Sequence, residues 1–155
     1  MTNEEFMKEA IDMAIDNVAN GGGPFGAVIV KDGKVIGRGV NRVTAQCDPT
    51  AHAEVSAIRD AARNTGSFSL EGATIYTSCE PCPMRLGAIS WARIAHIFYG
   101  NSQADAAKID FDDSFIYRQI EKPIGSRAIP ESQLLHSEAL KSFEAWTNKE
   151  DKTKY

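Results

Sequence analysis

Apolar residues recur at helical spacing along the first twenty residues of the chain. Thr2, followed three residues later by Glu5, forms the pattern of a capping box just before them. We therefore expect a helix over residues 4–20, which the glycine run 21–23 and Pro24 bring to an end. The residues of its apolar face are Phe6, Met7, Ala10, Ile11, Ala14, Ile15 and Val18.

Further along the chain, short apolar runs alternate with helical patterns. Residues 27–31 and 34–41 flank Asp32-Gly33, a two-residue hairpin signal, and residues 73–78 and 94–100 predict two more strands. We expect helices from residue 49 or 50 to 65, from about 80 to 93, and over 112–120 and 137–148. Strands that alternate with helices after an initial hairpin predict an α/β fold with a mixed sheet covered on both faces.

Size and composition predict an ordinary soluble protein. A length of 155 residues suits one domain with one core, so we expect a single domain over residues 1–155. The formal charge of −4 and the scattered basic residues argue against nucleic acid as a partner and favour a small neutral substrate. The acidic N-terminus and the lack of a long apolar run predict no secretory signal, no membrane partner and a cytoplasmic location. The three cysteines then indicate metal ligands or free thiols.

Two short stretches carry side chains suited to metal chemistry: His52 with Glu54, and Cys82 after Pro81. A catalytic zinc site uses three protein ligands and keeps one position for water, which then ionises near neutral pH. We expect His52 and Cys82 each in the first turn of a helix, where the partial positive charge favours a thiolate. A carboxylate beside that water, Glu54, can take its proton and return it. Each residue alone is more often structural, but together they favour a metal site.

On these residues and several further blocks the chain resembles the cytidine and deoxycytidylate deaminase superfamily, whose zinc signature reads His-x-Glu and then Pro-Cys-x-x-Cys. Within it, the resemblance is greatest to the small bacterial guanine deaminases. The last of the matching blocks separates these from the relatives that act on cytosine or on tRNA adenosine. The matching blocks are Gly23-Pro24-Phe25-Gly26-Ala27-Val28, Asn41, Asp48-Pro49-Thr50-Ala51-His52-Ala53-Glu54, Tyr76 to Met84, Leu86-Gly87-Ala88-Ile89, Trp91-Ala92-Arg93 and Phe111 to Tyr117.

The resemblance implies a three-layer α/β/α fold around a mixed five-stranded sheet, and hydrolytic deamination of guanine to xanthine and ammonia. It implies one catalytic zinc ion per protomer, held by His52 and Cys82, with Glu54 as the proton shuttle. It also implies a homodimer in which the tail, about residues 137–155, is exchanged between protomers. The residues that it implies for the purine base are Phe25 and Trp91 as walls, Asn41 as a hydrogen-bonding partner, Asp113 facing the exocyclic amine and serving as a second shuttle, and Tyr155 from the tail.

One position departs from the family pattern, because Arg85 stands where the second ligand cysteine is expected. A guanidinium stays protonated and has no acceptor atom, so it cannot bind a metal. Cys79, which forms Cys-x-x-Cys with Cys82, is a possible replacement ligand. An impaired or metal-free site, rescue by Cys79, and a substitution on an otherwise functional scaffold all stay open at this stage.

Three rival functions also stay open. A tRNA adenosine deaminase shares the metal motif but needs a basic docking face. A catalytically impaired homologue would keep the fold as a purine-binding or dimeric scaffold, with Arg85 as its main support. A deaminase of another purine, a nucleoside or a triazine would differ in the shape of its pocket, which the sequence does not reveal.

Overall fold

A mixed sheet of four strands forms the centre of the first part of the chain. Its strands are β1 (Gly26–Lys31), β2 (Lys34–Val40), β3 (Thr74–Cys79) and β4 (His96–Asn101), in the order β2-β1-β3-β4. Strand β1 pairs antiparallel with β2 and β3, and β3 pairs parallel with β4. The hairpin and the mixed sheet predicted from the sequence are confirmed.

The prediction of a fifth strand is wrong, because the sheet has four strands. The chain leaves β4 directly into a capping box, in which Ser102 accepts from the backbone N–H of Asp105 and opens the short helix α5 (Gln103–Ala107). The later elements are α6 (Ser114–Glu121), a 3-10 turn (Ile124–Ser126) and α7 (His136–Asn148). Capping and helical periodicity therefore take the residues that a fifth strand would need.

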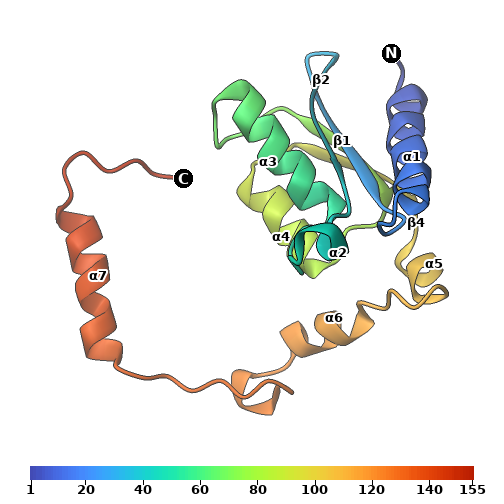
Figure 1. The fold of residues 1–155 in the computed structure, drawn as a ribbon. Helices are drawn as coiled ribbons and strands as arrows, with labels where there is room; N and C mark the ends of the chain where they lie inside the picture. Colours follow the sequence, from blue (N-terminus) through green and yellow to red (C-terminus); the bar gives the residue numbers. More distant parts are fainter. The chain divides into compact units, whose positions relative to one another are not determined.

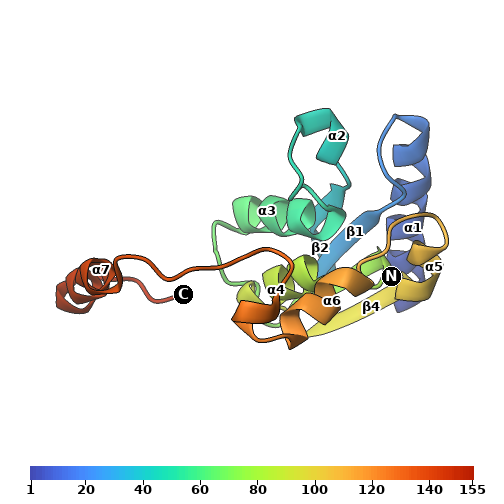
Figure 2. The same ribbon diagram turned by 90° about the horizontal axis from the view of Figure 1, so that it is seen from below.

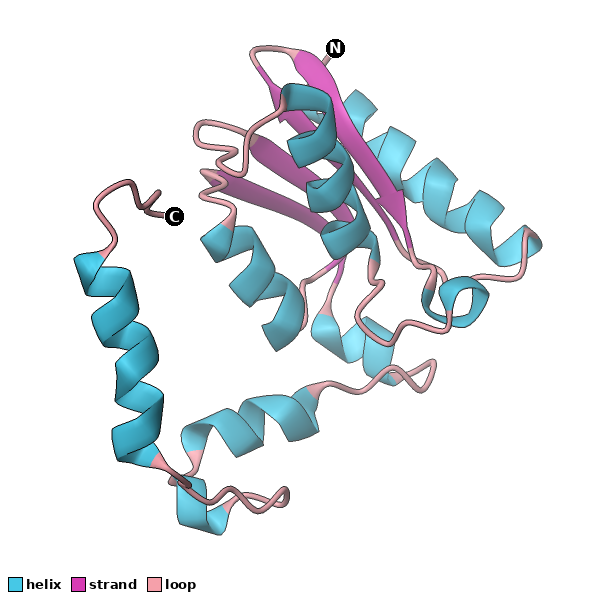
Figure 3. Cartoon of the chain, turned by 60° about the vertical axis from the view of Figure 1, so that its left-hand side comes forward, coloured by secondary structure: helices cyan, strands magenta, loops and turns pink.

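Helices cover both faces of the sheet, as predicted. Helix α1 (Asn3–Ala19) packs on one face, and α3 (Ala53–Thr65) and α4 (Pro83–Trp91) pack on the other (Figure 1). Seen from below, β1 and β2 lie between α3 and α1 (Figure 2), and the colouring by secondary structure shows the same layers (Figure 3). The side chains of β1 alternate accordingly, with Ala27 and Ile29 in the core under α3 and α4, and Val28 and Val30 in the core under α1.

Helix α3 lies unusually close to strand β2 because both elements carry small residues at their contact. A Cβ atom added at Gly39 would come within 2.3 Å of the carbonyl oxygen of Ala53 and the backbone nitrogen of Ala57. Only glycine fits such a close approach of two backbones. The contact places the first turn of α3 against the sheet, and with it the residues at the start of that helix.

The structure describes residues 1–155 as a computed structural model, which separates into two units, Met1–Ser114 and Phe115–Tyr155. In the second unit, Arg127 donates to the carbonyl oxygen of Gln119 at 3.0 Å and pairs with Glu131, while α7 buries none of its residues. The single domain over 1–155 and the exchanged tail stay predictions. No helix of the chain is both long and apolar enough to span a membrane.

Candidate active site

The starts of α3 and α4 lie next to each other at one end of the sheet. Helix α3 begins three or four residues later than expected, so that His52 is its N-cap residue rather than part of its first turn. The preceding loop is held by Asp48, which accepts from the hydroxyl of Thr50 at 2.7 Å and from its backbone N–H at 2.9 Å. These hydrogen bonds also lower the pKa of Asp48. The loop therefore delivers His52 in a defined position.

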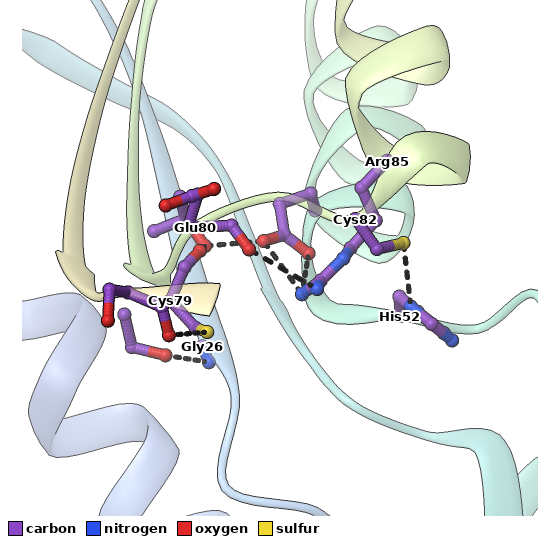
Figure 4. A network of polar contacts seen from close by, with 10 residues as sticks. Gly26, His52, Cys79, Glu80, Cys82 and Arg85 are labelled. Carbon is purple, nitrogen blue, oxygen red and sulfur yellow. Dashed lines mark hydrogen bonds and ion pairs between the residues drawn. The ribbon is translucent and has the colours of Figure 1, made fainter. Parts of the chain in front are cut away.

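Cys82 occupies the same position on α4, as its N-cap residue, with Pro83 at the start of the helix. Its Sγ lies 3.8 Å from Nδ1 of His52 (Figure 4). Burial alone raises the pKa of the Cys82 thiol, but the hydrogen bond with His52 and the positive charge of Arg85 outweigh it and bring the pKa to about 7. The structure thus brings together the two residues that the sequence predicts as zinc ligands.

Beside this pair, Glu54 and Arg85 form a buried ion pair. Nη1 of Arg85 lies 3.1 Å from each carboxylate oxygen of Glu54, and the Arg85 and Glu54 side chains are 8% and 0% exposed. The hydroxyl of Thr77, on β3, donates to Oε1 of Glu54 at 2.5 Å. Glu54 is the second residue of α3 and Arg85 the third of α4, so the two helix starts meet through this pair as well as through His52 and Cys82.

The guanidinium of Arg85 is enclosed on several sides. Its Nη2 lies 3.5 Å from the backbone oxygen of Glu80, and its central carbon lies 5.6 Å from the centre of the Phe25 ring. Burial lowers the pKa of Arg85, but the charge of Glu54 more than compensates and the net pKa is raised. One polar atom, Nε, is buried without a hydrogen-bond partner. Arg85 is therefore a fixed cation in the interior.

Cys79 ends strand β3 and is directed elsewhere. Its thiol donates to the backbone oxygen of Ser102 at 3.9 Å, and Figure 4 shows it apart from Cys82 and His52. Burial raises its pKa to about 11, with Arg85 acting in the opposite direction. A neutral thiol in this place differs from the thiolate that zinc requires. The role of Cys79 as a replacement ligand stays a prediction.

The side chains present do not fit a catalytic zinc site. Such a site needs three protein donors, and no group of three His, Cys, Asp or Glu side chains that could hold a metal ion is found. His52 and Cys82 offer two donors. Position 85 on α4, where a third ligand is expected, carries the guanidinium of Arg85, which forms an ion pair with the carboxylate of Glu54.

The residues predicted for the base are partly gathered around Phe25. Phe25 is buried and meets Phe111 edge to face at 5.0 Å, and its backbone oxygen accepts from the N–H of Asn41 at 3.2 Å. The side chain of Asn41 itself accepts from the N–H of Val43. Asp113 follows two residues after Phe111, and its Oδ1 is buried without a hydrogen-bond partner. The roles of Phe25, Asn41 and Asp113 toward the base stay predictions.

Trp91 and Tyr155 are both largely exposed. Trp91 ends α4 and lies beside the guanidinium of Arg93, while Tyr155 belongs to the second unit. Their assignment to the base stays a prediction.

Sequence reasoning did not single out Thr77 as a member of this site. The period-two pattern of β3 could have found it, because residues 75, 77 and 79 of a strand face the same side of a sheet. Nor did it predict that the guanidinium of Arg85 pairs with Glu54. No sequence signal identifies this partner, because the burial that forces the two charges together is a property of the fold.

Known proteins resemble the chain over its whole length. Residues 1–101 match the family described as the cytidine and deoxycytidylate deaminase zinc-binding region. The guanine deaminase of Bacillus subtilis (strain 168) is 53% identical over 100% of both chains. The crystal structure of the B. subtilis guanine deaminase superposes with a TM-score of 0.97 at 52% identity, covering 100% of this chain and 99% of that one.

A tRNA-specific adenosine deaminase of Buchnera aphidicola is 42% identical over 106 residues, which is 68% of this chain and 70% of the relative. The match to the guanine deaminase, by comparison, extends over the whole chain. The fold, the paired helix starts and the matched residues 1–101 together lead to one conclusion: the chain belongs to the cytidine and deoxycytidylate deaminase family.

Proposed function

We propose that the substrate of this chain is guanine and that its reaction is hydrolytic deamination to xanthine and ammonia. The similarity to a guanine deaminase over the full length of both chains carries the proposal. It includes the region after residue 101, which lies outside the family match and carries Asp113. The tRNA-specific relative, by contrast, matches 106 residues, and the acidic balance of this chain opposes RNA docking.

Two buried polar atoms without partners support a polar planar ligand. They are Nε of Arg85 and Oδ1 of Asp113. Buried polar groups are nearly always hydrogen-bonded, so the unpaired donor and the unpaired acceptor each indicate a missing partner. A purine base offers both an acceptor and an amine donor. The buried ring of Phe25, which contacts the guanidinium of Arg85, supplies an apolar wall for such a base.

Glu54 is the residue that we assign to proton transfer. A carboxylate in reach of the reacting atoms can hold a proton and deliver it to a ring nitrogen or to the leaving amine. Here both oxygens of Glu54 accept from Nη1 of Arg85, and one also accepts from Thr77. Both oxygens are thus engaged by donors of the chain itself, so that neither is free to exchange a proton with a bound base. We therefore propose that Arg85 keeps the rate of this chain far below that of an Arg85→Cys variant.

We assign no reaction step to a metal ion, because the donors of this chain number two. The family name includes zinc, and one zinc ion per protomer, held by His52 and Cys82 with Cys79 as the candidate replacement ligand, is what the resemblance to the family implies. The same holds for a cytoplasmic homodimer with an exchanged tail, in which Tyr155 of one protomer would reach the base in the other and Trp91 would wall it.

A second candidate function is favoured by one observation, the Glu54–Arg85 pair. A homologue that binds the purine without converting it needs the pocket but no free proton shuttle. Both candidates predict guanine binding; they differ in the turnover of the natural chain.

The proposal is tested by measuring the conversion of guanine to xanthine by chromatography. The natural chain, Arg85→Cys and Glu54→Ala/Arg85→Cys are compared, with zinc supplied to each. Ser90→Cys adds a thiol on the exposed side of the same helix and serves as the matched control. We expect xanthine from Arg85→Cys at a rate well above the natural chain and Ser90→Cys, and its loss when Glu54 is also replaced. If Arg85→Cys binds guanine no better than an unrelated base and forms no xanthine, the assignment of substrate and reaction is wrong.

A further inference from the structure

Position 85 lies where a second ligand side chain would leave helix α4. Cys82 is the N-cap of that helix and residue 85 follows three positions later, so both side chains lie on the same face of its first turn. A short thiolate there would point at the space next to His52 and Cys82. The longer side chain of Arg85 crosses this region and brings its positive charge to the carboxylate of Glu54.

The surroundings hold the guanidinium in this place. Glu54 is fully buried, and without Arg85 its remaining side-chain partner would be the hydroxyl of Thr77. The ring of Phe25 and the backbone oxygen of Glu80 contact the guanidinium on other sides. Moving Arg85 toward solvent would leave an ionised carboxylate in the interior with no counter-charge, which is strongly unfavourable.

We propose that Arg85 replaces the zinc ion of the family as the permanent counter-ion of Glu54, so that this chain folds without metal and takes up no zinc at His52 and Cys82. Two features exclude the ion. The donors number two instead of three, and a dication beside a fixed guanidinium would be repelled. What a metal supplies in a structural sense, a positive charge next to the buried carboxylate, comes here from the chain itself.

This inference concerns the site on which the proposed function rests, but it is tested by metal content and stability rather than by turnover. The absence of zinc and the proposed function can therefore each fail without the other. A zinc-free natural chain is compatible with any substrate, and a chain that binds zinc could still act on a base other than guanine.

The experiment measures zinc per chain by elemental analysis, and thermal unfolding with added zinc or with a chelator. The full-length natural chain, Arg85→Cys and the control Ser90→Cys are prepared in parallel in zinc-containing medium. We expect the natural chain and Ser90→Cys to carry no stoichiometric zinc and to unfold at a temperature that neither zinc nor chelator changes. Arg85→Cys should carry about one ion per chain, and its unfolding temperature should rise with zinc and fall with chelator.

A second variant covers the case in which Arg85→Cys fails to fold without its counter-ion. Glu54→Gln/Arg85→Cys removes the buried negative charge along with the guanidinium, so it needs no counter-ion and keeps the same thiols and His52. It too should take up zinc. The proposal is overturned if the natural chain carries one zinc ion whose removal lowers its unfolding temperature. It is equally overturned if neither variant at position 85 binds more zinc than Ser90→Cys.

Discussion

Replacing Arg85 by methionine tests the energy of the buried ion pair directly. Methionine keeps much of the aliphatic volume and removes the charge, so the carboxylate of Glu54 is left fully buried with Thr77 as its side-chain partner. Coulomb's law for two charges at the 3.1 Å of the contact, with an effective dielectric constant of about 20, gives an attraction of about 5 kcal/mol. Breaking a buried pair by removing one partner costs about 3–5 kcal/mol.

The assay is urea and thermal unfolding followed by circular dichroism. For a chain of this length, a loss of about 3–5 kcal/mol lowers the unfolding temperature by roughly 6–20 °C. The matched control is Arg59→Met, which breaks an exposed pair: Nη1 of Arg59 lies 3.6 Å from Asp48, and the Arg59 side chain is 56% exposed. That change should alter the free energy of unfolding by about 0–1 kcal/mol.

The double variant Glu54→Gln/Arg85→Met completes the cycle. Because it removes both charges, it should recover much of the stability lost in Arg85→Met. The reasoning is refuted if Arg85→Met is no less stable than Arg59→Met, or if the double variant is no more stable than Arg85→Met.

Two further predictions concern the same site, and a third concerns the packing of the helix that carries Glu54. In the Arg85→Cys background, Glu54→Ala should retain guanine binding, measured by calorimetry, and should lower the rate of xanthine formation about 10²–10⁴-fold. An unchanged rate would show that Glu54 does not transfer the proton. Because the pKa of Cys82 is lowered to about 7, its thiolate should form as the pH rises through about 7, which ultraviolet absorbance measures against a Cys82→Ser control. Arg85→Met should move the midpoint of this titration upward, and an identical midpoint would mean that the guanidinium does not act on the thiol. Thiolate formation in the folded state adds stability that is fully present above the ordinary thiol pKa and is lost as the pH falls through about 7. Gly39→Val should unfold the chain or strongly lower its unfolding temperature, since the new side chain meets the backbone of Ala53; a variant with native stability would disprove the close packing of α3 on β2.

The elements and the pair of helix starts could be predicted from local pattern. The periodicity of the first helix, the Asp32-Gly33 hairpin and the apolar run before Cys79 are signals between residues close in sequence, and the structure confirms them. His52 and Cys82 could be brought together because two helices that follow strands of one sheet begin at the same edge. The helix starts were placed a few residues early, since an N-cap residue adopts an extended conformation that periodicity does not detect.

The charge arrangement in the interior required the tertiary structure. That Arg85 cannot bind a metal follows from its chemistry alone, but where its guanidinium goes depends on residues far away in the sequence. Glu54 comes from α3, Thr77 from β3 and Phe25 from the segment before β1, and only the packed sheet and helices bring them around position 85. A side chain as long as arginine can reach many partners, and burial selects the one whose charge it must compensate. The sequence alone therefore determined the family and the pair His52 and Cys82, while the fold decided that the cation beside them is a guanidinium bound to Glu54.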